Sequence, residues 1–161
     1  KGFKTIKEAK EWLKAGAIYG LKKKLEPGIY FDSGTGRGLG VEISVTDENG
    51  NNFLVKRKFK KHLNKLGHFI LKDVSNNYGE LLACYHALKI ADQKEIKKVF
   101  GDSKLVINYW SKGFMNKGKL PLKTNKLIKS VARLRKKFEE NGGSVEYISG
   151  DDNPADLGFH K

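Results

Sequence analysis

The amino-acid sequence predicts an α/β fold in which helices flank a mixed β-sheet. β-Rich runs dominate residues 29–56, and apolar residues at helical spacing recur through much of residues 75–140. Single β-rich runs follow helical segments at 96–100 and 144–149. A strand that follows a helix runs parallel to a neighbouring strand through a right-handed crossover. Parallel strands added to an antiparallel hairpin give a mixed sheet between helices.

The chain opens with an amphipathic pattern. Residues 3–24 have apolar side chains at helical spacing with lysines between them, and the sequence EPG then interrupts the helix. A short β-rich run, IYF, leads into the glycine-rich turn SGTGRGLG. Residues 1–24 are therefore expected to form an N-terminal helical segment, and residues 25–161 the main domain.

Residues 41–59 carry the clearest hairpin signal. Val41, Ile43 and Val45 alternate onto one face of the first run. The residues ENGNN separate this run from a second β-rich run, which predicts a β-hairpin. The next residues, 60–74, are ambiguous between a loop and extended chain.

Three helices are expected in the second half of the chain. Their sequence signals are a polar capping residue, an apolar periodicity and, for the last helix, a proline in the first turn. The expected helices start at Ser75 or Asn76, at Asp102 or Ser103 (running through Trp110), and at Pro121 (running to about Glu140).

Composition indicates one domain with a polyanionic partner. The 161 residues include 32 Lys and Arg against 18 Asp and Glu, a formal net charge of +14. This excess favours nucleic acid first and an anionic membrane second, although a lysine-rich organism would also produce it. From Lys112 to Lys137 there are ten Lys and Arg and no acidic residue. We therefore expect a basic face beside a separate acidic site.

Other features constrain the protein's setting. The single cysteine, Cys84, cannot form an internal disulfide, which favours a reducing compartment. No apolar run approaches the ~18 residues of a membrane span. We expect a cytoplasmic monomer without a membrane partner. Because Met115 is the only methionine, Lys1 is not a translation start, and the chain is expected to be a fragment or a processed product.

Four carboxylates stand where the expected elements would present them to one site, since ligands of α/β sheets collect beyond the strand ends. They are Asp32 in or after the first strand, Glu80 in the first turns of a helix, Asp102 after a central strand, and Asp156 in the tail. Each has a structural alternative: a turn for Asp32, the helix dipole for Glu80, a helix cap for Asp102 and a solvated loop for Asp156. Gathered together they would repel one another unless cations held them, and oxygen ligands favour Mg²⁺ or Mn²⁺ over zinc.

The sequence around these carboxylates resembles the type 1 ribonucleases H, in particular the bacterial ones. The matching blocks are IYFDSGTGRG, SNNYGELLACYHAL, VFGDSKLVINYW and NPADLG, in the family's order, over residues 29–158. The resemblance implies the ribonuclease H-like fold, with a five-stranded mixed sheet flanked by helices. It also implies endonucleolytic hydrolysis of the RNA strand of RNA/DNA hybrids, which leaves 5′-phosphate and 3′-hydroxyl ends.

The resemblance further implies a two-metal mechanism with Mg²⁺, or alternatively Mn²⁺, held by all four carboxylates. Asp32 would bridge both ions, with Asp102 beside it. Glu80 would serve one ion and accept a hydrogen bond from a ribose 2′-hydroxyl, which is how the site would distinguish RNA from DNA. Asp156 would complete the shell of the second ion.

Contacts with the hybrid are implied at five further residues. The side chains of Ser75, Asn76 and Asn77 would bind base edges or phosphate oxygens, although Ser and Asn also favour helix caps. Lys104 would contact a phosphate or a ribose. Thr35 lies in the glycine-rich turn, whose backbone can approach the RNA strand closely.

The sequence departs from the family pattern beside two of the four carboxylates. The loop SGDDNPAD lacks the histidine that many members carry before the last aspartate. Asp152 would replace it near the second metal or remain a solvated loop residue, and His160 is a weaker substitute. The family's NPG after the first aspartate is replaced by GTGRG, which changes the contacts expected of that turn.

The grip on the substrate is also expected to differ, because the loop between Ser111 and Lys119 is too short for the family's basic handle. Nearby lysines, with Trp110 or Phe114 close to the DNA strand, are the expected replacements. The opening KGFKTIKEAKEWL resembles the end of the small hybrid-binding domain that precedes many of these nucleases. Residues 1–24 would then be the end of such a domain.

Other functions stay open at the level of sequence. A nucleic-acid-binding module with an inactive site would need a missing carboxylate, and none of the four is missing. A nuclease or strand-transfer enzyme that acts on DNA is disfavoured by the SNNxxE pattern. NPADLG also resembles the tails of some retrotransposon nuclease domains, so a retroelement origin is open.

Overall fold

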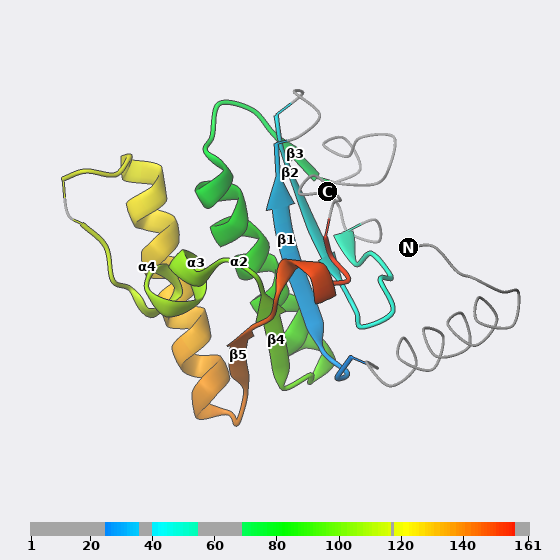
Figure 1. Ribbon diagram of the computed structural model, residues 1–161. Coiled ribbons are helices and arrows are strands. Elements are labelled where there is room, and N and C mark those ends of the chain that lie inside the picture. Colours follow the sequence, from blue (N-terminus) through cyan, green and yellow to red (C-terminus); the bar gives the residue numbers. More distant parts are fainter. Residues whose placement is uncertain (1–24, 36–39, 55–68, 117, 157–161) are drawn as a thin grey trace, which may run out of the picture.

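Five strands form one mixed sheet in the order β3-β2-β1-β4-β5 (Figure 1). The computed structural model describes residues 25–35, 40–54, 69–116 and 118–156. β2 is antiparallel to β1 and β3, whereas β4 is parallel to β1 and β5 is parallel to β4. The expected mixed sheet is therefore confirmed. The strands are β1 Ile29–Gly34, β2 Val41–Thr46, β3 Phe69–Leu71, β4 Lys98–Gly101 and β5 Ser144–Tyr147.

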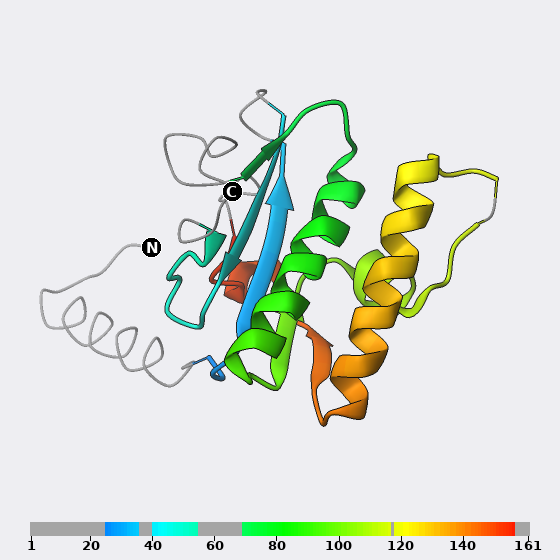
Figure 2. The same ribbon diagram turned by 180° about the vertical axis from the view of Figure 1, so that it is seen from behind.

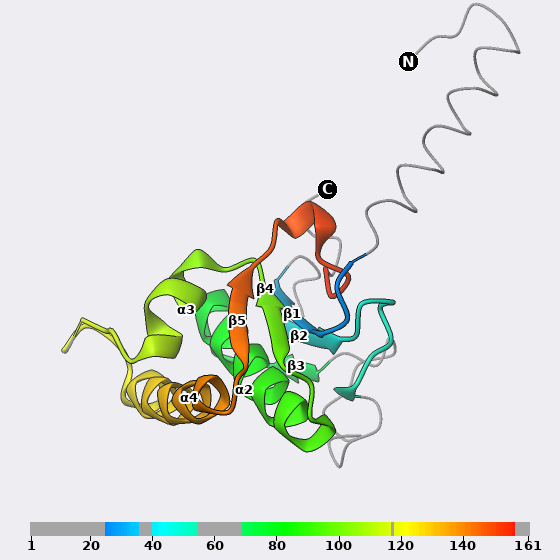
Figure 3. The same cartoon turned by 90° about the horizontal axis from the view of Figure 1, so that it is seen from below.

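Two long helices lie side by side on one face of the sheet, and a short 3₁₀ helix, η4, lies on the other (Figures 2 and 3). The long helices start at the same end of the molecule. None of the helices in the described ranges combines the length and the apolar character that a bilayer crossing requires. The helices are α2 Asn76–Lys94, α3 Lys104–Asn108, η3 Trp110–Lys112, α4 Leu122–Glu140 and η4 Gly150–Asp152.

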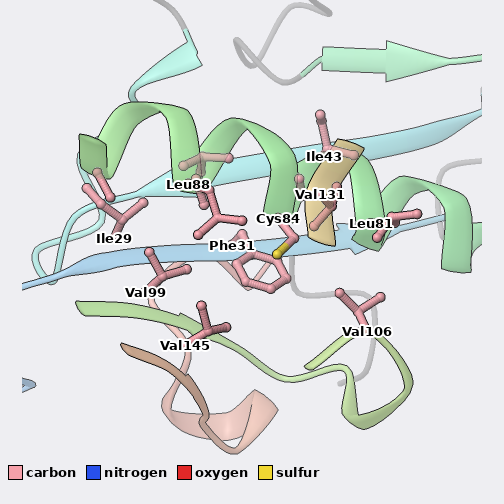
Figure 4. Close-up of a cluster of buried hydrophobic side chains, with 14 of the residues drawn as sticks. Ile29, Phe31, Ile43, Leu81, Cys84, Leu88, Val99, Val106, Val131 and Val145 are labelled. Atoms are coloured by element: carbon pink, nitrogen blue, oxygen red, sulfur yellow. The ribbon is translucent and has the colours of Figure 1, made fainter. Parts of the chain in front are cut away.

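The hydrophobic core lies between α2 and the sheet (Figure 4). Ile29 and Phe31 of β1 and Ile43 of β2 are fully buried there, which confirms the alternation read from the sequence. The α2 side chains Leu81 and Cys84 meet them from the helix. Burial raises the pKa of the Cys84 thiol to about 12, so this cysteine is a core residue without thiolate character.

The helix caps agree with the sequence. Ser75 Oγ accepts a hydrogen bond from the Tyr78 backbone N–H (3.1 Å), and Ser103 Oγ accepts one from Val106 N–H (3.3 Å). The predicted helix through Trp110 is interrupted, however, because Tyr109 leaves helical geometry (φ −129°, ψ −67°). The chain then continues as η3, so this prediction was wrong beyond residue 108.

The predicted hairpin after β2 is present at its turn, where Phe53 N–H donates a hydrogen bond to the Val45 carbonyl oxygen (2.9 Å), and the rest of its second run, residues 55–59, lies outside the described residues. Asp47 Oδ1 closes a turn by accepting hydrogen bonds from Asn49 N–H and Asn51 N–H (both 2.9 Å). Beyond the turn, Asn52 makes one isolated bridge with Thr46. β2 has β1 on one edge, and on the other edge its residues 41–43 pair with β3. β3 falls within the stretch that was ambiguous in the sequence.

Some sequence-based predictions fall outside the described residues. They are the helix expected at 3–24, the glycine-rich turn at 36–39, residues 55–59 of the second β-rich run, and His160.

Candidate active site

Three carboxylates meet at the middle strand of the sheet, β1, beside α2 and the end of β4. One carboxylate oxygen each of Asp32, Glu80 and Asp102 lies within 4.8 Å of the other two. Asp32 and Glu80 are buried, with 0% and 4% exposure, and Asp102 is partly exposed. Three acidic groups at this separation repel one another strongly where water is scarce. The arrangement is therefore costly unless a proton or a cation occupies it.

Strand register explains why the two aspartates meet. β1 and β4 are parallel neighbours, and Phe31 pairs with Gly101. Asp32 and Asp102 each follow one of these paired residues, so the same register places them side by side. The close approach requires Gly101, because a Cβ at that position would collide with the Phe31 ring. Asp102 therefore lies directly after the end of β4, beside β1 and before the start of α3.

Glu80 reaches the same place because α2 approaches β1 closely. At Gly79 a Cβ would collide with the side chains of Val41 and Ser33, so only glycine permits this distance. Ser33 Oγ also donates a hydrogen bond to Asn76 Oδ1 (2.8 Å), which fixes the first turn of α2 against β1. Glu80 follows Gly79 and is thus held over the strand that carries Asp32.

The electrostatics of Glu80 reflect this crowding. Burial, followed by the negative charges of Asp32 and Asp102 and a hydrogen bond with Asp32, raises the pKa of Glu80 well above its ordinary value. A backbone hydrogen bond from Ser33 opposes the rise. The metal-free cluster therefore retains a proton on Glu80 at pH values where an exposed glutamate is ionised.

The residues present fit a hard divalent cation. Glu80 Oε2 is buried and has no hydrogen-bond partner, which is unusual for a buried polar atom. All three potential ligands are carboxylates, the donor type that Mg²⁺ and Mn²⁺ prefer. A cation there would offset the mutual repulsion and satisfy the open oxygen.

Asn153 supports the cluster and was not anticipated from the sequence. Its Nδ2 donates hydrogen bonds to the Phe31 carbonyl oxygen (2.9 Å) and to Asp102 Oδ2 (3.3 Å), while its Oδ1 accepts one from Ala155 N–H (3.0 Å). The side chain is 4% exposed. The sequence feature that could have indicated this role is the single asparagine in the turn DDNPAD, three residues before the predicted metal ligand Asp156.

Asp156 and Asp152 stand apart from the group of three. Asp156 is partly exposed, and its backbone N–H donates to the Asn153 carbonyl oxygen (3.0 Å). Asp152 lies at the end of η4 and is exposed. The candidate metal-binding group found among the described residues includes neither of them. Their predicted roles near a second metal stay predictions.

Three of the residues expected to contact a hybrid, Ser75, Asn76 and Asn77, lie at the N-terminus of α2. Ser75 and Asn77 line a cavity of about 300 Å³ that also contacts Lys123 and Thr124 at the start of α4. Lys123 Nζ lies 3.5 Å from the Asp73 carbonyl oxygen, and 5.3 Å from the centre of the Tyr78 ring. The beginnings of two helices and a lysine thus face one hollow, a combination suited to an anion.

The remaining predicted contacts differ in how they are held. Asn76 uses its amide oxygen for the hydrogen bond from Ser33, so its amide nitrogen is the group left for a ligand. Thr35 is exposed just after β1. Lys104 is exposed at the start of α3, and its Nζ lies 5.3 Å from the centre of the Tyr147 ring. This cation–π contact holds the ammonium two residues after Asp102.

Comparison with known proteins identifies the fold. No protein-family model and no curated protein sequence matches the chain significantly. Among solved structures, RNase H1 from the halophilic archaeon Halobacterium salinarum NRC-1 superposes with a TM-score of 0.51 at 16% identity, covering 81% of this chain and 91% of that one. LC11-RNase H1, isolated from compost by a metagenomic approach, gives a TM-score of 0.45 at 19% identity over 77% and 83% of the two chains. The superposition on the archaeal structure, together with the strand order β3-β2-β1-β4-β5, shows that the chain has the ribonuclease H-like fold, with its acidic cluster at the junction of β1, α2 and β4.

Proposed function

We propose that this protein is a metal-dependent endoribonuclease that hydrolyses the RNA strand of RNA/DNA hybrids. The products would carry 5′-phosphate and 3′-hydroxyl ends. The observation that carries the proposal is the meeting of Asp32, Glu80 and Asp102 within 4.8 Å, on a chain with a net charge of +14. The fold and the sequence blocks around these three carboxylates support the same activity.

Asp32, Glu80 and Asp102 would hold the metal, with Mg²⁺ as the first choice, Mn²⁺ as the alternative and two ions in total. Asp156 would contribute to the second ion, and Asp152 could assist there. Bound divalent cations supply charge that activates a water molecule for attack and stabilises the departing oxygen. Asn153 positions Asp102, because its side-chain N–H donates a hydrogen bond to Asp102 Oδ2 and so fixes the orientation of that carboxylate.

Glu80 would read the sugar as well as hold metal. By the sequence resemblance, its carboxylate would accept a hydrogen bond from a ribose 2′-hydroxyl in addition to serving a cation. A deoxyribose lacks that donor, so this contact would be lost with DNA. This difference supports cleavage of RNA rather than DNA.

The other contacts would position the hybrid. A backbone phosphate would occupy the cavity between Ser75, Asn77 and Lys123, where helix N-termini and an ammonium favour an anion. Lys104 and Thr35 would contact the RNA strand. These residues share one feature: each has an exposed side chain that can donate a hydrogen bond to a phosphate or a sugar.

The wider setting is proposed on the sequence resemblance. Residues 25–161 would form a catalytic domain of the bacterial type 1 kind, and residues 1–24 the end of a hybrid-binding domain. The protein would act as a monomer in the cytoplasm.

The test is a substrate panel. The protein is incubated with end-labelled RNA/DNA hybrid, duplex RNA, duplex DNA and single strands, with Mg²⁺, Mn²⁺ or EDTA. Cleavage of the RNA of the hybrid alone, lost in EDTA and in Asp102→Asn, is the expected result. Glu140→Gln, on the exposed end of α4, is the control for loss of an acidic charge. Cleavage of DNA, or cleavage that survives EDTA, would refute the proposal, and binding without cleavage would identify a binding module.

A further inference from the structure

One face of α4 is a continuous row of cations, here named the α4 basic stripe. At about 100° per residue, its members fall within an arc of about 140°. All are exposed, and the opposite face of α4 is buried against the core. The stripe consists of Lys123, Lys126, Lys129, Arg133, Lys136 and Lys137.

The stripe has no internal neutralisation. α4 has no acidic residue in its first turn and no side-chain cap, although acidic residues there would favour the helix. Its acidic residues, Glu139 and Glu140, come at its C-terminal end. Within the described part of the chain, none of the six cations forms an ion pair with a carboxylate. The ion pair found on α4 joins the buried Arg135 to Glu139 (3.3 Å). Like charges along one helix face destabilise it, so an external anion would stabilise this element.

The stripe begins at the proposed phosphate cavity and ends in a second hollow. Lys123 lines the cavity beside Ser75 and Asn77. Farther along α4, Arg133 and Lys136 line a hollow of about 670 Å³ together with Lys112 of η3. Glu139 and Glu140 also border that hollow, and Glu139 is partly neutralised by Arg135.

Buried contacts hold the two walls of the second hollow in place. Arg135 Nη1 donates hydrogen bonds to Ser111 Oγ (2.6 Å) and to the Ile107 carbonyl oxygen (2.5 Å). Arg135 and Ser111 are 5% and 0% exposed. These contacts join the middle of α4 to α3 and η3, so the helices that carry the cations facing the hollow are held together by buried hydrogen bonds.

We propose that the α4 basic stripe is a second nucleic-acid contact surface, which grips the sugar–phosphate backbone of the hybrid outside the carboxylate site. This inference rests on the proposed function and extends it. From Lys123 to Lys137 the stripe is about 21 Å long at 1.5 Å per residue. One strand carries a negative charge about every 3.4 Å along the axis, so the stripe can face about six phosphates. Affinity therefore depends on hybrid that extends beyond the cleavage site.

The test compares two matched triple variants. Lys129→Gln/Arg133→Gln/Lys136→Gln removes three charges from the stripe. Lys89→Gln/Lys94→Gln/Lys97→Gln removes three charges from α2 and the turn after it. Both sets spare the residues proposed to contact metal or the cleaved strand, and thermal unfolding verifies that each variant is folded.

The measurements are the dissociation constants for two hybrids in EDTA across a range of salt, and cleavage in Mg²⁺. One hybrid covers the carboxylate site alone, and the other is longer by about six base pairs. For the stripe variant we expect weaker binding of the long hybrid, by about 10-fold or more, and a slope of log Kd against log salt that is smaller by about 2–3. Its kcat on the short hybrid stays at the wild-type value, and the control triple variant binds both hybrids nearly as tightly as the wild type.

Equal weakening in the two triple variants would overturn the inference, because the effect would then be one of net charge. Binding to phosphatidylserine vesicles is measured for the same variants. If the stripe variant loses vesicle binding while its affinity for hybrid is unchanged, the inference is overturned and the stripe is assigned to a membrane surface. Failure of the proposed function has another signature: the wild type then cleaves neither hybrid. In that case a selective loss of long-hybrid binding in the stripe variant would still support the stripe.

Discussion

Glu80 links the stability of the metal-free protein to pH. Its folded-state pKa is raised, so folding favours the protonated form. The corresponding stability is fully present below the pKa of the unfolded chain and is lost as pH rises through the folded-state pKa. We therefore expect the Tm in EDTA to fall as pH increases across this interval. Mg²⁺ should restore it, increasingly so at higher pH, because metal ligands must be deprotonated.

Glu80→Gln should remove this dependence. The amide cannot ionise, so the metal-free Tm should stay higher than that of the wild type at neutral and alkaline pH. The rate of cleavage should fall by more than the ~10–100-fold typical of substitutions at residues that only hydrogen-bond to a metal ligand. Calorimetry with and without Mg²⁺ measures the first effect, and hybrid cleavage the second. Glu140→Gln should behave like the wild type, and a wild-type Tm that rises with pH in EDTA would contradict the reasoning.

At the same scale, the sequence predicted Asp32, Glu80 and Asp102 but not Asn153. The three carboxylates stand in sequence blocks that resemble those of a known family, and this resemblance, rather than their spacing, predicted that they meet. Asn153 acts through hydrogen bonds to partners 122 and 51 residues away, and nothing in its immediate neighbours encodes those distances. Ser103 was predictable as a cap because its partner is three residues away.

At the scale of elements, Gly79 controls where α2 rests on the sheet. In Gly79→Ala, the new methyl group would collide with Val41 and Ser33, forcing α2 away from β1. We expect a loss of about 1–3 kcal/mol in the free energy of unfolding, measured by denaturant titration. Cleavage should also fall, because Glu80 moves with the helix.

The control for that substitution is Asp92→Ala, on the exposed last turns of the same helix. It should change stability by no more than about 0.5 kcal/mol. If Gly79→Ala were equally mild, the close packing of α2 on β1 would not be what positions Glu80.

Elements were predictable where the local pattern and the tertiary contacts agree. β1, β2, β4, β5, α2 and α4 were all anticipated from alternation, helical spacing and capping residues. The pairing of residues 41–43 of β2 was not anticipated, because the partner of a strand edge is decided by competition among all strands. β3 occupies that edge, although its three residues carry little signal of their own. Tyr109 likewise breaks the helix at a point where the apolar spacing continues.

For the whole molecule, the net charge of +14 predicts that binding and cleavage have different selectivities. Phosphate contacts carry no information about the sugar, so in EDTA the protein should bind hybrid, duplex DNA and duplex RNA with similar, strongly salt-dependent affinities. Under the proposed function, selectivity for hybrid should appear in cleavage, where Glu80 would accept a hydrogen bond from the ribose. Competition titrations at two salt concentrations measure the first property. Tight binding of hybrid that is insensitive to salt would contradict it.

The acidic cluster draws on residues 32, 80 and 102, and its supporting amide on residue 153. A chain emerging from the ribosome therefore cannot assemble the cluster until β4 has paired with β1, and cannot brace it until the turn after β5 is complete. Short fragments would carry the basic charge of the protein but none of its concentrated negative charge. If the proposed function holds, such fragments would bind nucleic acid without cleaving it, so contact with RNA during synthesis would precede the capacity to cleave it.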